Sequence, residues 1–198
     1  MAKPAWMTTT PTSGSGTGTV NVGAQSHTGR TPRSGQVTFK AAGVTDRLLN
    51  VTQAAKAEFV TIQNATAPQG GGNVTLTGVS NTSRLNFALG TGEIVLTLPP
   101  SFTAGGVSTN NNVAIAGDPG AVAEYEFAIT INVPANAGIS SLQRIIQVTA
   151  MGGQSASATI TQAAGEPTLT INPTTIELNA NGDAVPVTVT SNTNWTVE

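Results

Sequence analysis

The sequence predicts an all-β protein built from tandem immunoglobulin-like β-sandwich domains. Residues 146–165 align without a gap onto residues 37–56, at a constant offset of 109 positions. Charged residues make up only 9% of the chain, against about 25% in an average globular protein. Thr, Asn, Ser, Gly and Val take their place, which favours short strands and many turns. No stretch combines helical periodicity with a cap and sufficient length, so the class is all-β.

The two aligned segments each read as a hairpin that closes a sandwich. Gly43 stands at the predicted turn of the first, and a Gly-Gly pair at that of the second. Glycine accepts the positive φ that tight hairpins require. Apolar residues alternate in both arms, so each hairpin has one face to bury; they are Val37, Phe39, Leu49 and Val51, then Ile146, Val148, Ala158 and Ile160. Both copies leave through Thr-Gln-Ala-Ala into a new strand, as tandem sandwich domains do.

Residues 1–57 are predicted to form a small N-terminal domain. Trp6 opens it, a Ser/Gly-rich turn follows, and Val20 and Val22 point inward from a strand over residues 19–22. A domain of this size buries only about 60% of the surface of its unfolded chain. We therefore expect it to lean on a neighbour or a binding partner.

Residues 58–165 are predicted to form a larger sandwich. The clearest strand is 124–133, where Tyr125, Phe127 and Ile129 begin a strict alternation that Ile131 and Val133 continue. The other strands are expected over residues 59–63, 74–77, 84–89, 93–98 and 113–116, followed by the closing hairpin. About seven strands in 108 residues is the size of an immunoglobulin-like sandwich.

Residues 166–198 begin a third copy without a closing hairpin. Asn181-Gly182 is a strong two-residue hairpin signal, and Val185, Val187 and Trp195 follow it. Half a sandwich exposes a strand edge and its apolar face. We expect either that the natural chain continues beyond Glu198 or that another subunit completes the sheet.

The charge is unevenly divided along the chain. Residues 1–57 carry six basic residues and one acidic residue, a net charge of +5, whereas residues 58–198 carry two basic and nine acidic residues, a net charge of -7. Chance in a chain with few charges is one explanation. The other is that the first domain docks on an acidic surface. No aromatic residue is interleaved with the basic ones, which disfavours nucleic acid as the partner.

The residues also carry a resemblance to a known family. Residues 167–173, Asn181-Gly182 and residues 187–195 resemble the first half of the Bacteroidetes-associated carbohydrate-binding (BACON) domain. The two Thr-Gln-Ala endings resemble that family's end, and Trp6, Pro11, Arg30 and Gly35 are a looser match. Such repeats occur in secreted Bacteroidetes glycan enzymes and in virion proteins of tailed phages, including crAss-like ones. The resemblance covers most of residues 1–57 and 166–198, but only the end of residues 58–165.

No arrangement of residues predicts an enzyme, a cofactor site or a metal site. The chain has no cysteine, and its one histidine, His27, lies in a Ser/Thr/Gly loop. Glu124 and Glu126 share the outer face of one strand, and Asp118 stands in a Pro-Gly turn with no second acidic cluster for calcium. No apolar run is long enough to span a membrane. The first residues do not resemble a secretory or lipoprotein signal, so we expect synthesis in the host cytoplasm without export.

Two function classes remain. The first is a structural virion protein, a decoration or head-fibre protein on the outside of a tailed-phage capsid, anchored to the major capsid protein through its N-terminal domain. The expected docking residues are Lys3, Trp6, Arg30, Arg33 and Arg47. The second is a non-catalytic carbohydrate-binding module of a secreted or cell-surface Bacteroidetes protein. Host surface glycans and further copies of the chain are additional candidate partners; nucleic acid, membrane and cofactors are not.

Overall fold

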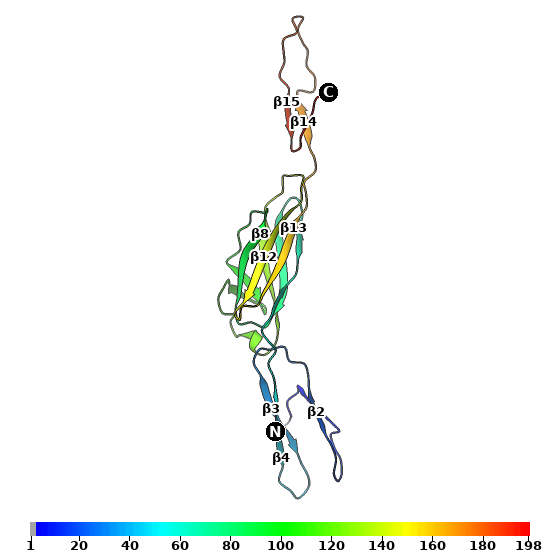
Figure 1. The fold of residues 1–198 in the computed structure, drawn as a ribbon, viewed down its shortest axis with the longest axis vertical. Helices are drawn as coiled ribbons and strands as arrows, with labels where there is room; N and C mark the ends of the chain where they lie inside the picture. The colour runs from blue at the N-terminus through cyan, green and yellow to red at the C-terminus, as the bar shows by residue number, and fades with distance from the viewer. Residues whose placement is uncertain (1–2) are drawn as a thin grey trace.

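The computed structural model describes residues 3–198 and is built from strands, with a single 3-10 turn and no α-helix among them. Three parts follow one another along an elongated molecule: two N-terminal hairpins, a central sandwich and a C-terminal hairpin (Figure 1). The prediction of an all-β fold with sandwich architecture is confirmed. No described segment forms a helix that could cross a membrane.

The N-terminal part consists of two antiparallel hairpins. The first pairs β1 (Met7–Thr10) with β2 (Asn21–Ala24), and the second pairs β3 (Arg33–Phe39) with β4 (Arg47–Gln53). Each is a separate two-stranded sheet, so residues 3–57 do not close into a sandwich of their own. Met7 and Val37 are the buried large apolar residues of this part, and Met7 is the fully buried one of the two.

The central sandwich contains nine strands in two sheets. A five-stranded sheet has the order β10-β9-β11-β7-β5, and a four-stranded sheet has the order β6-β13-β12-β8. Their bounds are β5 Val60–Ile62, β6 Ala65–Ala67, β7 Gly72–Ser80, β8 Leu85–Gly92, β9 Ser101–Ala104, β10 Val107–Asn110, β11 Tyr125–Val133, β12 Leu142–Ala150 and β13 Ser155–Gln162; the 3-10 turn η1 is Pro119–Ala121.

The core of the molecule lies between these two sheets. The predicted alternation over β11 is confirmed, because every second side chain from Tyr125 to Val133 is buried. Phe127 packs edge-on against Phe87, with ring centroids 5.7 Å apart. All residues of the one large apolar cluster among the described residues fall between Val60 and Ile160.

Two predicted strands are wrong. Residues 93–98 keep the expected alternation, with Ile94 buried and Val95 exposed, but they form no ladder. Glu93 and Ile94 both donate their N–H groups to the Gln143 carbonyl. The Ile94 carbonyl accepts a hydrogen bond from the Arg144 side chain and not from a neighbouring strand. The chain therefore leaves the sheet at an irregular step.

The other wrong strand, over residues 113–116, reduces to a single bridge between Arg84 and Ala114. The structure instead forms strands β9 and β10, which the sequence analysis did not predict. They are joined by Gly105 and Gly106, whose φ angles are 55° and 82°. Two successive positive φ values are what a tight hairpin turn requires.

The repeated hairpins adopt the same register, as the 109-residue offset predicts. Val37 pairs with Leu49 in the first copy, and Ile146 pairs with Ala158 in the second. Gly43 and Gly153 have positive φ at the two turns. The environments differ, however: Leu49 is 41% exposed, whereas Ala158 is 1% exposed.

The C-terminal part is one hairpin, in which β14 (Leu169–Asn172) pairs with β15 (Thr188–Ser191). It lies at the opposite end of the molecule from the N-terminal hairpins (Figure 1). Its apolar side chains are open to solvent, and Trp195 is 50% exposed.

The only tyrosine of the chain gives a direct test of the sandwich core. Burial raises the pKa of Tyr125 to about 12 from its ordinary value of 10.0, and its hydroxyl donates to the Thr82 carbonyl at 3.0 Å. The folded state holds this proton more tightly than the unfolded state. Stability from this group is therefore complete below pH 10 and falls as pH rises toward 12, by about 2–3 kcal/mol. Tyrosinate absorbance should titrate with a midpoint near pH 12.

Tyr125→Phe is the control for this titration. It should abolish the absorbance change and remove this part of the pH dependence. The lost hydrogen bond should cost roughly 1 kcal/mol at neutral pH. A tyrosinate midpoint near 10 in the wild-type chain would show that Tyr125 is not buried.

Candidate functional site

The two N-terminal hairpins are joined by a polar cluster at the end nearest the sandwich. The Arg33 side chain donates to the Gln53 side chain and to the Gln25 carbonyl, both at 2.9 Å. Gln53 also donates to the Gln25 carbonyl, at 2.9 Å. The Arg33 guanidinium lies 4.6 Å from the centre of the Trp6 ring, a cation–π contact. Arg33 and Trp6 thus act within the chain to hold one hairpin against the other.

Away from this cluster the hairpins enclose an open groove of about 560 Å³. Its apolar walls are Pro11, Val20, Val37 and Phe39, and the rest of its lining is the Ser/Gly-rich turn, neighbouring Thr residues and Lys40. Phe39 is 40% exposed. Apolar side chains that face a groove of this kind are a candidate binding surface.

A second polar cluster joins the N-terminal part to the sandwich. The Arg30 side chain forms a bidentate ion pair with Asp118 and donates to the Asn81 carbonyl at 3.1 Å. Hydrogen bonding to Asp118 raises the pKa of the Arg30 guanidinium above its ordinary value. Backbone bonds add to the joint, because the N–H groups of Arg30 and Thr31 donate to carbonyls of Gly120 and Ala121 at 3.0 Å.

Asn81 is the centre of this joint. It is fully buried, and its side-chain amide donates to the Thr28 carbonyl at 3.1 Å and to the Ala57 carbonyl at 3.2 Å. Its side-chain oxygen accepts from the Phe59 N–H at 3.0 Å. A buried amide with its partners satisfied fixes the backbone that it contacts. Asn81 therefore sets where the first part ends and the sandwich begins.

Gly29 makes the joint tight. A Cβ atom at this position would stand 2.4 Å from the backbone carbon of Val122. Only a residue without a side chain permits that approach. An exposed ion pair between Lys56 and Glu124, 3.6 Å apart, also links the N-terminal part to the sandwich.

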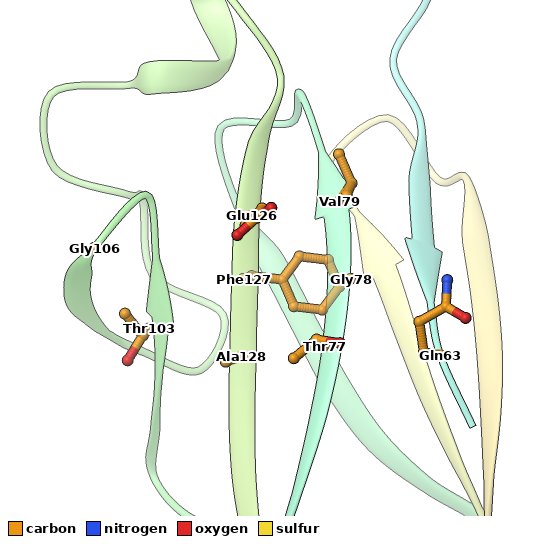
Figure 2. Close-up of a pocket in the computed structure, with 9 residues that line it drawn as sticks. All are labelled: Gln63, Thr77, Gly78, Val79, Thr103, Gly106, Glu126, Phe127 and Ala128. Atoms are coloured by element: carbon orange, nitrogen blue, oxygen red, sulfur yellow. The ribbon is translucent and has the colours of Figure 1, made fainter. Parts of the chain in front are cut away.

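A shallow hollow of about 430 Å³ lies on the outer face of the five-stranded sheet (Figure 2). Figure 2 shows the Phe127 ring beside Gly78, where a Cβ atom would meet the ring at 2.3 Å. The lining carries one carboxylate, Glu126, and one amide, Gln63, and its other residues are Thr, Gly, Val, Ala and Phe127. Phe127 is 2% exposed, so the hollow has no aromatic surface on which a sugar ring could stack.

The single histidine and the acidic side chains form no candidate metal site among the described residues. The His27 ring is hydrogen-bonded to the Thr31 carbonyl at 2.8 Å, and no group of three or more His, Cys, Asp or Glu side chains occurs among residues 3–198. Asp118, which the sequence places in a turn, is the partner of Arg30.

The five predicted docking residues lie in different surroundings. Trp6 and Arg33 meet in the cluster between the hairpins, and Lys3 donates to the Met7 carbonyl at 2.7 Å. Arg30 faces the chain's own sandwich through Asp118. Arg47 stands on the exposed start of β4, and its side chain forms none of the ion pairs or hydrogen bonds found in residues 3–198. Arg47 is therefore the one of the five that projects freely.

Sequence reasoning missed the residues that join the parts, although a signal for them exists. Ser80-Asn81-Thr82 recurs as Ser191-Asn192-Thr193. A polar tripeptide at the end of a strand, repeated in both copies, is typical of residues whose side chains bond to the neighbouring backbone.

Comparison with known families supports the resemblance on the N-terminal part. Residues 1–54 match the model of the BACON family, described as "Putative binding domain, N-terminal". The match covers the two hairpins and not the central sandwich. A search of curated proteins gave no match to the chain.

The joint can be tested by amide hydrogen exchange at Arg30 and Thr31. Gly29→Ala forces a side chain against the Val122 backbone, so both amides should lose protection by at least about tenfold. Asp118→Asn weakens a partly exposed ion pair worth up to about 1 kcal/mol, so it should have a smaller effect of the same sign.

Asp46→Asn is the matched control for Asp118→Asn. It removes the ion pair of Lys40 and Asp46 at the far end of the second hairpin, and it should leave the two amides unchanged. Unchanged protection in Gly29→Ala would show that the joint is not closed in solution.

Proposed function

We propose that the protein is a non-catalytic structural component of a tailed-phage virion, a decoration or head-fibre protein on the capsid exterior. The observation that carries this proposal is the end-to-end arrangement of β units, in which the polar clusters bind one part of the chain to the next. An extended rod of this kind suits a protein that projects from a surface. The resemblance to repeats of phage virion proteins supports the choice of that surface.

The N-terminal part is the proposed anchor. It holds the match to a binding domain, the open apolar groove and a net charge of +5. Exposed ion pairs contribute only about 0–1 kcal/mol each, so apolar burial supplies most of the affinity. Charge sets the register and the rate of association. Among the docking residues, Arg47 is the proposed direct contact, whereas Arg30 and Arg33 keep the anchor in shape.

A glycan-binding role is the second candidate, because the matched family is described as a binding domain. Trp195, which is 50% exposed, is the aromatic side chain that could serve it. Trp6 is partly covered and is occupied by Arg33. The two candidates differ in the part of the chain that makes the contact.

The test is co-sedimentation of the full chain with undecorated phage heads over a salt series. Binding should weaken as salt rises, since the charge contribution is screened. Arg47→Glu should reduce the affinity by about three- to tenfold, mainly through the association rate. Glu177→Lys is the control, an exposed charge reversal at the opposite end, and it should not weaken binding.

Two outcomes would contradict the proposal. In one, the heads bind neither the wild-type chain nor the Glu177→Lys control at any salt concentration. In the other, the chain binds a bacterial polysaccharide, and Trp195→Ala abolishes that binding while Arg47→Glu does not. The second result would favour the glycan-binding candidate.

A further inference from the structure

The central sandwich shows which strands form each half of a complete unit. Its first half runs from β5 to β8, and its second half contains β11, β12 and β13. The halves are held together by three pairings: β7 with β11, β8 with β12, and β6 with β13, the last being parallel. Each half therefore buries the apolar face of the other.

The N-terminal part repeats the second half of that sandwich. Besides the hairpin register, three hydrogen bonds recur between equivalent positions at the 109-residue offset. In the N-terminal part, the Gln53 side chain donates to the Gln25 carbonyl, the Lys56 N–H donates to the Gly29 carbonyl, and the His27 ring bonds to the Thr31 carbonyl. In the sandwich, the Gln162 side chain donates to the Pro134 carbonyl, the Gly165 N–H donates to the Gly138 carbonyl, and the Asn136 side chain donates to the Ser140 carbonyl. By this correspondence β2 matches the end of β11, β3 matches β12 and β4 matches β13.

The C-terminal hairpin repeats part of the first half, namely β5 and the end of β7, without a counterpart of β8. Four hydrogen bonds of the central sandwich recur there, at offsets of 109 residues before the hairpin turn and 111 after it. The Asn81 side chain bonds to Phe59 and Ala57, and its counterpart Asn192 bonds to Thr168 and Glu166. The Ser80 side chain bonds to Phe59 and Thr82, and its counterpart Ser191 bonds to Thr168 and Thr193. Thus β14 matches β5, and β15 matches the end of β7.

The apolar side chains that are covered in the central sandwich have exposed counterparts in both terminal parts. Phe39 is 40% exposed and its counterpart Val148 is 0% exposed. Val187 is 39% exposed and its counterpart Leu76 is 1% exposed. Among residues 3–198, β2, β4, β14 and β15 each have a single strand partner, so each keeps one free edge.

We propose that these two half-sandwiches are complementary, and that residues 166–198 of one copy complete the N-terminal part of a second copy. One molecule cannot join its own halves, because they lie at opposite ends of the elongated molecule (Figure 1). The halves also differ in charge: residues 1–57 carry +5, whereas residues 166–198 carry four acidic and no basic residues, a net charge of -4. Opposite charges favour this pairing over head-to-head or tail-to-tail contact.

The central sandwich gives the expected register. Ile131 pairs with Val74 and Ile129 with Leu76 in the antiparallel ladder of β11 and β7. The same ladder between copies places Val22 opposite Val185 and Val20 opposite Val187. The incoming hairpin then covers the groove beside Val37 and Phe39. The proposed capsid contact uses the same groove, so the two contacts exclude each other in any one copy, and only the innermost copy of an assembly would use its groove on the capsid.

The contact is heterologous, because one end of each copy meets the other end of the next. Such contacts form rings when the rotation closes and open filaments when it does not. The purified 198-residue chain should therefore form linear or closed assemblies whose mass rises with concentration. This inference does not depend on the proposed capsid, and the experiment uses the purified chain alone.

Two variants define the interface. Leu49→Asp places a charge on the apolar face of the N-terminal half, and Val187→Asp does so on the C-terminal half. Each should weaken self-association by at least about 30-fold, since the carboxylate would be buried without a partner. Each alone should be a monomer by sedimentation and light scattering, with the Tyr125 titration unchanged as evidence of an intact sandwich.

The decisive measurement is the mixture of the two variants. Leu49→Asp retains a sound C-terminal half and Val187→Asp a sound N-terminal half, so an equimolar mixture should give a dimer with one copy of each and nothing larger. Thr52→Asp and Thr190→Asp, on the outer faces of β4 and β15, are the controls and should assemble like the wild-type chain. A wild-type chain that stays monomeric at all concentrations, a single variant that still self-associates, or a mixture that does not dimerise would overturn the proposal.

Discussion

The structure depends on one constraint: an apolar sheet face must be covered by a second sheet whose strands come from a distant part of the chain. In the central sandwich β7 and β11 build one such face, pairing over nine residues although more than forty residues separate them in sequence. The four-stranded sheet of β6, β13, β12 and β8 covers that face. Burial of about 25 cal/mol per Å² of apolar surface makes this pairing favourable despite the cost of closing the loop. Where both halves are present the interior is closed, and Ile131, Ile146 and Ile160 are fully buried.

The same constraint explains why the terminal parts differ from the centre while sharing its local geometry. Their hydrogen bonds form within each terminal part, and Asn192 reproduces the contacts of Asn81 with Phe59 and Ala57 without any sandwich around it. Burial is not local, because it needs the opposite half. Local pairing and apolar burial are thus separable in this chain, and a half-sandwich retains the first without the second.

This separation also determines how much could be predicted from the sequence. The all-β class, the β11 alternation and the register of the repeated hairpins follow from periods of two and from glycine, which are local signals. Residues 93–98 have the same alternation, but the Arg144 side chain replaces a ladder bond at Ile94, and a side-chain contact across 50 residues leaves no periodic trace. The candidate site was less predictable for the same reason: basic composition indicated Arg30, but its partner Asp118 lies 88 residues away.

Repetition supplies the long-range information that periodicity lacks. A chain that contains one complete copy of a unit also contains the template for its incomplete copies, and here the template gives the partner, the register and the buried residues of each open half. Apolar edges left uncovered are a hazard, since they pair with any exposed strand. Specific bonds around Gln53 and Asn192 restrict each hairpin to one geometry, so that one complementary half fits better than an arbitrary strand. The polar bonds thereby determine which partner the apolar faces accept. A rod whose two ends are complementary half-sandwiches extends through the same strand pairings that join the two halves of its central sandwich.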